Sequence, residues 1–288
     1  MTAIPSISLE FFPPATPKAE AAFWPALERL SALDPVCVSI TYGAGGTDRT
    51  RSDRTLRELL ARGLAEPAAH LTCVGQTRAE VDACAAGWAA AGINRLVALR
   101  GDMPDLAAAY RPHPQGYENA AALVAGLVGI ADFDISVACY PENHPESPSP
   151  EADLDNRKRK LDAGAQRAIS QYFFEAADFL RFRDRARRAG IEAPLVPGIL
   201  PVFHYAKVQA FSRRCGASIP DWLAARFDGL DADPETRDLV AATTASELCL
   251  ELLREGVEQF HFYTLNRATL TLAICRMLGL RPALEEAA

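Results

Sequence analysis

Eight short apolar runs rich in β-branched residues alternate along this chain with longer stretches of helical periodicity. Such alternation is typical of βαβ units and a parallel sheet. Eight units are the number that closes a (β/α)8 barrel, and right-handed crossovers favour one closed barrel over two domains. We therefore predict one α/β domain over 1–288, a (β/α)8 TIM barrel. Its strands are expected in "ISLEFF" (7–12), "VCVSITYG" (36–43), "HLTCVG" (70–75), "RLVALRG" (95–101), "DISVACYP" (134–141), "AISQYFF" (168–174), "PLVPGILP" (194–201) and "FHFYTLN" (260–266).

Helices are expected between these runs, and an insertion separates the last two strands. The insertion should add a short helix near 220–227 and a long one near 234–254. The stretch "MPDLAAAYRPHPQG" at 103–116 has no periodicity, and we expect a loop there that acts as a flap. The other expected helices span 18–32, 49–64, 77–91, 117–129, 151–163, 177–189, 205–214 and 267–278.

Composition excludes several classes of protein. Hydrophobic residues make up 49% of the 288 residues, enough for a sizeable core, and a net charge of -7 argues against a general nucleic-acid or membrane-surface binder. The seven cysteines are scattered with no CxxC pair and no zinc-type histidine spacing, so we predict free thiols and no metal site. The sequence shows neither a signal peptide nor a spanning apolar run, which predicts a cytoplasmic protein.

Polar side chains recur where the expected strands end. A barrel places its active site at the carboxyl ends of its strands, so such side chains meet at one mouth. Each alone has an ordinary structural explanation, because a carboxylate late in a strand is usually a salt-bridge partner. A functional site is favoured because all these side chains converge on one mouth. The residues in question are Glu10, Thr41, His70, Asp102, Tyr140, His144, Gln171, Tyr263, Asn266 and Arg267.

Glu10 is unusual because it stands between Leu9 and Phe11 in an apolar run. Side chains alternate between the two faces of a strand, so Ile7, Leu9 and Phe11 share one face. Glu10 therefore points to the opposite face, inward or upward, away from the layer that packs on the helices.

The segment "DLDNRKRK" at 153–160 carries polar and cationic residues at three- and four-residue spacing. A run of charges on a helix is usually a solvated face. Near the mouth, however, Asp153, Asn156, Arg159 and Lys160 would suit ribose hydroxyls and a pyrophosphate. "GAGG" at 43–46 does not complete GxGxxG, and no other nucleotide-binding signature is present, so a dinucleotide must be held by other means.

Nine segments, in order, resemble the methylenetetrahydrofolate reductase family in its single-domain bacterial form. They are "LEFFPP", "VSITYGAGG", "HLTCV", "ALRGDMP", "ACYPENHPE", "DNRKRKLDAGA", "ISQYFF", "PGILPV" and "FHFYTLNR", and the likeness runs from about 6 to 282. The chain stops after the last barrel helix at "RPALEEAA", so we expect no C-terminal regulatory domain and no inhibition by S-adenosylmethionine.

This resemblance implies an oxidoreductase of one-carbon metabolism and methionine biosynthesis. It would reduce 5,10-methylenetetrahydrofolate to 5-methyltetrahydrofolate with NADH or NADPH by a ping-pong mechanism, using bound FAD as the hydride relay. A homo-oligomer is expected. Glu10 matches the general acid that protonates N10 of the folate. A barrel mouth flanked by Phe11 and Phe12 would raise the pKa of this acid.

The resemblance also implies roles for other residues. Asp102 would tune the flavin and stabilise the cationic folate iminium. Lys207 stands where bacterial members carry Gln, and its cation could meet the folate glutamate tail. The implied FAD contacts are Thr41, Tyr42, His70, Arg100, Gly101, Asp102, Tyr117, Glu118, Tyr140, His144, Asp153, Asn156, Arg159 and Lys160. The implied folate contacts are Glu10, Asp102, Gln171, Lys207, Phe211, Tyr263 and Arg267.

Three other interpretations remain open at this point. The same redox pair could run physiologically in reverse, oxidising 5-methyltetrahydrofolate, or could exchange electrons with a ferredoxin-type subunit. A non-catalytic flavin- or folate-binding barrel is a second class, which the presence of Glu10 and Asp102 disfavours. A metal-dependent hydrolase is weaker, because His70 and His144 lack an HxH-type partner.

Overall fold

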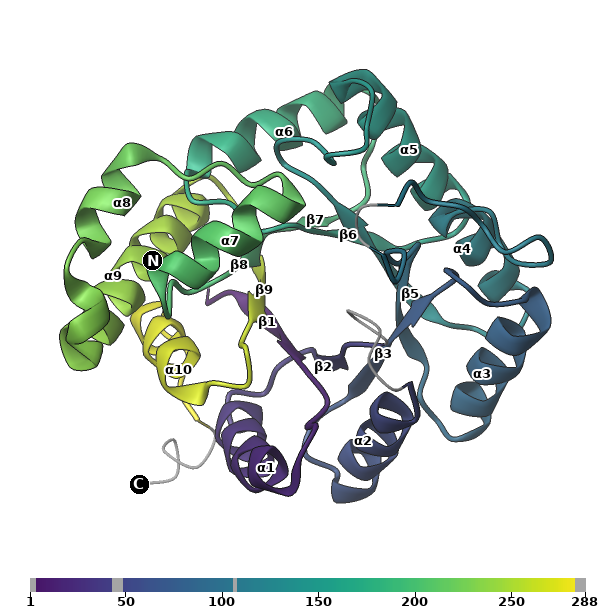
Figure 1. Cartoon of the computed structure of the whole chain (residues 1–288), viewed down its shortest axis with the longest axis horizontal. Coiled ribbons are helices and arrows are strands. Elements are labelled where there is room, and N and C mark those ends of the chain that lie inside the picture. Colours follow the sequence, from purple (N-terminus) through teal and green to yellow (C-terminus); the bar gives the residue numbers. More distant parts are fainter. Residues whose placement is uncertain (1–3, 43–48, 106–107, 283–288) are drawn as a thin grey trace.

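The computed structural model describes residues 4–42, 49–105 and 108–282, so the "GAGG" segment at 43–46 lies outside the described part. Its parallel strands form one sheet in the order β7-β6-β5-β4-β3-β2-β1-β9-β8, and Figure 1 looks into the resulting ring. The predicted barrel is confirmed. The strands are β1 (Ser6–Phe11), β2 (Cys37–Ile40), β3 (Pro67–Thr72), β4 (Arg95–Leu99), β5 (Asp134–Cys139), β6 (Arg167–Ser170), β7 (Leu195–Val196), β8 (Gly198–Ile199) and β9 (Gln259–Tyr263).

One predicted strand is divided into two. The run at 194–201 forms β7, which pairs with β6, and β8, which pairs with β9, with Pro197 between them. Proline has no backbone N–H to donate, so the ladder breaks there. The Pro197 carbonyl still accepts a bond from the His261 backbone N–H at 2.9 Å. β7 and β8 therefore act as two halves of one barrel strand.

Helices surround the ring of strands, and α8 and α9 supply the predicted insertion (Figure 1). Side-chain caps begin several helices; Thr77 and Glu80 form a capping box at the start of α3. The helices are α1 (Pro17–Ser31), α2 (Arg49–Arg62), α3 (Arg78–Ala90), α4 (Ala120–Val128), α5 (Pro150–Asp162), α6 (Ala176–Arg188), α7 (Tyr205–Cys215), α8 (Asp221–Phe227), α9 (Pro234–Arg254) and α10 (Ala268–Met277).

The main hydrophobic core lies between the strands and the surrounding helices. In β1, Ile7, Leu9 and Phe11 are at most 2% exposed and belong to this core. Phe11 meets Phe23 of α1 edge to face, with ring centroids 5.5 Å apart. The predicted alternation of β1 is confirmed, and it leaves Glu10 on the barrel side of the strand.

Gly198 lets three strands approach closely near the mouth. A Cβ at this position would lie 2.1 Å from the Ser170 carbonyl oxygen and 2.6 Å from the Tyr263 ring, so a side chain does not fit. The Gly198 N–H donates to Ser170 Oγ at 2.9 Å, and the Tyr263 hydroxyl donates to the Ser170 carbonyl at 2.8 Å. These bonds fix Tyr263 in the mouth.

The described helices include none that is long and apolar enough to cross a membrane. All seven cysteines are free, as predicted. Within residues 4–42, 49–105 and 108–282, no group of three His, Cys, Asp or Glu side chains is arranged to hold a metal ion.

Candidate functional site

Two imidazoles face the Glu10 carboxylate inside the barrel. His70 Nε2 lies 3.5 Å from Glu10 Oε2, and His261 Nε2 lies 3.6 Å from the same oxygen. The three side chains come from β3, β1 and β9, and that of Glu10 is 15% exposed. The sequence predicted His70 at the start of its strand, whereas β3 begins three residues earlier and puts His70 in its second half. Parallel pairing therefore brings these groups together.

The expected flanking of Glu10 by Phe11 and Phe12 is wrong. The Phe11 ring lies in the core on the opposite face, and Phe12 is 40% exposed. Burial does raise the pKa of Glu10, but the His261 hydrogen bond and the charges of His70 and His261 when protonated outweigh it, so its pKa lies below the ordinary value. These surroundings favour the ionised form of Glu10. A general acid here needs a source for its proton.

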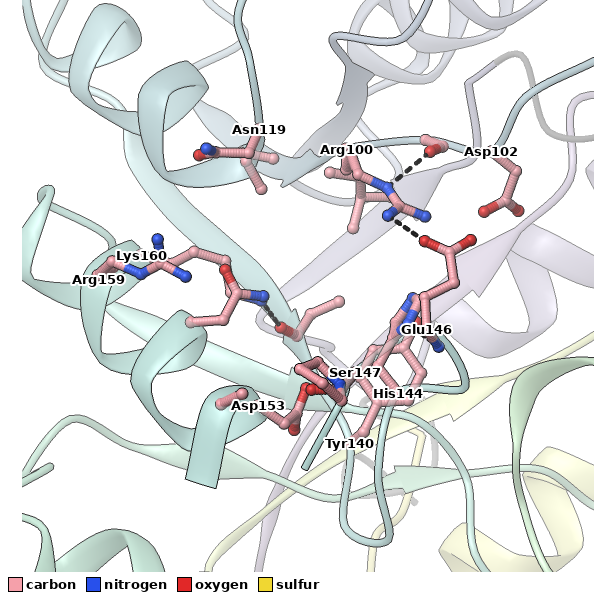
Figure 2. A pocket seen from close by; sticks show the side chains of 18 residues that line it. Arg100, Asp102, Asn119, Tyr140, His144, Glu146, Ser147, Asp153, Arg159 and Lys160 are labelled. Carbon is pink, nitrogen blue, oxygen red and sulfur yellow. Dashed lines mark hydrogen bonds and ion pairs between the residues drawn. The ribbon is translucent and has the colours of Figure 1, made fainter. Parts of the chain in front are cut away.

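A cavity of about 480 Å³ opens beside the carboxyl ends of β4 and β5 (Figure 2). Lys160 and Arg159 of α5 lie across it from Arg100 and Asp102, which follow β4. The structure thus brings together residues from three separate sequence segments. Of the predicted cofactor contacts, its lining includes Arg100, Gly101, Asp102, Tyr140, His144, Asp153, Asn156, Arg159 and Lys160.

Arg100 is held by an ion pair that the sequence reasoning did not identify. Its Nη1 lies 2.5 Å from Glu146 Oε2, and its guanidinium stacks on Tyr110 at 4.5 Å from the ring centroid. Gly101 follows with a φ of 82°, in the left-handed region that favours glycine. A Cβ there would also lie 2.5 Å from Val74 Cγ1. This turn positions Arg100 and exposes Asp102 at the cavity.

Helix α5 directs buried charges toward the cavity. Lys160 is 7% exposed, and its Nζ donates to the Ala138 carbonyl at 2.5 Å. Burial lowers the pKa of Lys160 to about 8, although Asp153 acts in the opposite direction. Arg157, another residue that the sequence reasoning missed, pairs with Asp153 at 3.0 Å and is 3% exposed. The segment "DLDNRKRK" is therefore only partly the solvated face of a helix.

The cavity lining does not include the other predicted FAD contacts. The Tyr42 side chain is buried and meets Trp88 edge to face, with ring centroids 5.7 Å apart. Tyr117 is also buried, and its hydroxyl donates to Asp82 Oδ1 at 2.6 Å. Both rings therefore pack among the outer helices and do not line this cavity. Thr41 is buried at the end of β2, His70 faces Glu10, and Glu118 is exposed next to lining residue Asn119.

The predicted folate contacts form a second group around the mouth. Tyr263 follows His261 in β9, with ring centroids 5.2 Å apart, and burial raises its pKa well above the ordinary value. Gln171 follows β6, and its side-chain oxygen accepts from the Tyr172 backbone N–H at 3.0 Å. Exposed side chains on or beside α7 and α10 complete this group: Lys207, Phe211 and Arg267.

The family model that describes methylenetetrahydrofolate reductase matches residues 2–279. The chain belongs to the methylenetetrahydrofolate reductase family. Proteins named 5,10-methylenetetrahydrofolate reductase from Salmonella typhimurium and Escherichia coli are each 48% identical to it over 279 residues. The match covers 97% of this chain and 92% of each relative. The family and its barrel were therefore both predicted correctly from the motifs.

A solved structure supports the fold at much lower sequence identity. It is described as an uncharacterized protein from Clostridium thermocellum that binds two copies of 5-methyl-5,6,7,8-tetrahydrofolic acid. It aligns with a TM-score of 0.62 and 14% identity, over 100% of this chain and 97% of its own. At this identity the likeness shows the shared architecture alone.

Proposed function

We propose that this protein reduces 5,10-methylenetetrahydrofolate to 5-methyltetrahydrofolate with electrons from NADH or NADPH. The observation that carries the proposal is the Glu10 carboxylate facing His70 and His261 inside the mouth of a chain from this family. Opening the five-membered folate ring requires a proton on N10 as the bond to the bridging carbon breaks. We assign this proton transfer to Glu10, the carboxyl group inside the mouth, once it has gained a proton.

The cavity beside β4 and β5 fits FAD. Arg100, Arg159 and Lys160 supply cations for a pyrophosphate, and Asp153 and Asn156 supply acceptors for hydroxyl groups. When bound, FAD supplies a centre that accepts a hydride from the nicotinamide and donates it to the folate. His70 Nε2 is buried and has no hydrogen-bond partner among the described residues, and it lies 3.5 Å from Glu10 Oε2.

The residues around the mouth bind and orient the folate. Gln171 and Tyr263 offer polar contacts to its ring system, and the exposed ring of Phe211 is free to stack on it. Lys207 and Arg267 offer cations for the carboxylates of the glutamate tail. Glu10 then protonates N10, and the Asp102 carboxylate stabilises the cationic iminium that results.

A ping-pong order follows if both substrates use the same mouth in turn. The nicotinamide cofactor would bind, give up its hydride and leave before the folate enters. Such an order agrees with a chain that carries no GxGxxG segment for a separate dinucleotide domain.

Anaerobic spectroscopy of the purified protein tests this function. We expect FAD to give a flavin absorption band that NADH or NADPH bleaches, and 5,10-methylenetetrahydrofolate to restore the band. Stopped-flow comparison of NADH, NADPH and 5-methyltetrahydrofolate as reductants would rank the partners and show the preferred direction. A colourless protein that gains no such band with added FAD would instead favour a non-catalytic barrel.

Lys160→Met should weaken FAD binding by about tenfold, because a buried cation to the pyrophosphate is lost. Wild-type affinity should fall as the pH rises through about 8, where Lys160 loses its proton, and the variant should lack this dependence. Titration of the apoprotein by flavin fluorescence measures both effects. Lys158→Met is the matched control, because Lys158 lies on the same helix but pairs with Asp162 at the surface. Equal behaviour of the two variants would contradict the assignment.

A further inference from the structure

The side chains that α5 buries are all charged. They belong to Asp153, Arg157 and Lys160, whereas α6 beside it buries alanine and phenylalanine side chains. A surface helix normally packs an apolar stripe on its neighbours, and a buried charge costs free energy unless it is paired. The cavity lining includes Asp153 and Lys160 but not Arg157. The buried charge of Arg157 therefore needs an explanation other than direct contact with a ligand.

Arg157 lies behind Asp153, on the side away from the cavity. Its Nη2 donates to Asp153 Oδ2 at 3.0 Å and to the Tyr140 carbonyl at 3.4 Å. Its guanidinium also stacks on the Phe182 ring of α6, 4.0 Å from the ring centroid. The backbone after β5 and the neighbouring helix thus hold the guanidinium, and the guanidinium holds one oxygen of Asp153.

The Asp153–Arg157 pair is poorly explained as a source of stability. Buried ion pairs contribute little net stability, because the cost of removing both charges from water offsets their attraction. Arg157 Nε is also buried without a hydrogen-bond partner among the described residues, which adds a further cost. A methionine of similar length would pack on Phe182 without these costs. What the guanidinium does provide is a fixed carboxylate on the wall of the cavity.

Two neighbouring cations have other partners. Lys160 donates to a backbone carbonyl of β5, and Arg185 of α6 donates to the Pro141 carbonyl at 3.2 Å. Without Arg157, the buried Asp153 carboxylate would lose its counter-ion, and such a group takes up a proton or turns toward solvent. Either change would remove a hydrogen-bond acceptor from the cavity. Arginine keeps its charge in proteins, so the counter-ion is present at every working pH.

We infer that Arg157 is the positioning residue that holds the Asp153 carboxylate ready to accept hydrogen bonds from the hydroxyl groups of FAD. This inference rests on the proposed function. Oδ2 stays bound to the guanidinium, while the carboxylate forms part of the cavity wall, as Figure 2 shows. Hydrogen bonds to an ionised acceptor are about twice as strong as those between neutral groups. Because the carboxylate is fixed before binding, little side-chain entropy is lost when FAD enters.

A double-mutant cycle tests whether Arg157 acts through Asp153. Arg157→Met and Asp153→Asn should each raise the Kd for FAD by about tenfold, the loss of roughly one charge-assisted hydrogen bond. The double variant should also stay near tenfold, because Arg157 has no carboxylate left to position. Titration of the apoproteins by flavin fluorescence measures all three values. A loss of about a hundredfold in the double variant, the product of two independent effects, would overturn the inference.

A conservative variant and the double variant separate positioning from folding. Arg157→Lys keeps a cation four residues after Asp153, so it should bind FAD within about threefold of wild type. If it bound FAD as weakly as Arg157→Met, the pairing would not be responsible and the inference would fail. Should Arg157→Met not fold, the double variant still removes both buried charges, and its affinity must match that of Asp153→Asn. Thermal unfolding without FAD, followed by circular dichroism, reports the fold of each variant.

Arg57→Met is the matched control. Asp53 and Arg57 of α2 have the same four-residue spacing and pair at 2.9 Å, but their side chains are 40% and 50% exposed. This variant should bind FAD with wild-type affinity. A wild type that binds no FAD would refute the proposed function. A wild type that binds FAD, with Arg157→Met binding it equally well, would refute the inference alone.

Discussion

Glu10→Gln is expected to slow the folate half-reaction by about 10²- to 10⁴-fold and to leave flavin reduction by NADH or NADPH nearly unchanged. Glutamine has almost the same size but no acidic proton, so N10 cannot be protonated as the ring opens. The nicotinamide half-reaction transfers a hydride and needs no acid at this position. Single-turnover stopped-flow measurements of the two half-reactions separate these effects.

Glu58→Gln is a suitable control for this substitution. It removes a carboxylate of α2 that pairs with Arg62 at 2.6 Å, with its side chain 32% exposed. Both half-reactions should keep their wild-type rates in this variant. If Glu10→Gln lost both half-reactions to the same degree, Glu10 would be holding the site together and its role as an acid would be wrong.

The barrel could be predicted from sequence because its signals are local. A strand with a packed face and an interior face alternates at a period of two, which correctly placed Ile7 and Glu10 on opposite faces of β1. Pro197 is visible in the sequence, but the sequence does not show that the seventh strand divides there. The division depends on pairing with two neighbouring strands, β6 and β9. Proline in a strand was the available signal.

The surroundings of Glu10 could not be predicted in the same way. The sequence reasoning took its neighbours along the chain, Phe11 and Phe12, whereas its partners in space come from β3 and β9. One signal was available, because His261 lies two residues before Tyr263 and so shares its face of β9. The partnership of Arg100 with Glu146 had no such signal, since it depends on how the loop after β5 folds across the cavity.

Asp102 is a different kind of residue from Glu10 because its carboxylate is exposed at the cavity. Solvent screens an exposed charge, so its effect on a neighbouring reaction is smaller than that of a buried acid. The charge nevertheless lies on the turn fixed by Gly101, close to the Arg100 and Glu146 pair. The proposed mechanism uses the position of this charge.

Asp102→Asn should raise the midpoint potential of the bound flavin by roughly 30 mV, which is about 1.4 kcal/mol for a two-electron couple. Loss of the negative charge makes the anionic reduced flavin easier to form and a weaker hydride donor. The same loss removes the stabilisation of the cationic folate iminium, so folate reduction should slow by about tenfold to a hundredfold. Dye-equilibrated redox titration and single-turnover kinetics measure the two effects.

Asp132→Asn removes the same charge from an exposed site that precedes β5, at the opposite end of that strand, and should change neither value. An unchanged potential in Asp102→Asn would contradict the electrostatic role, and a slower folate step with that result would assign Asp102 to binding the folate.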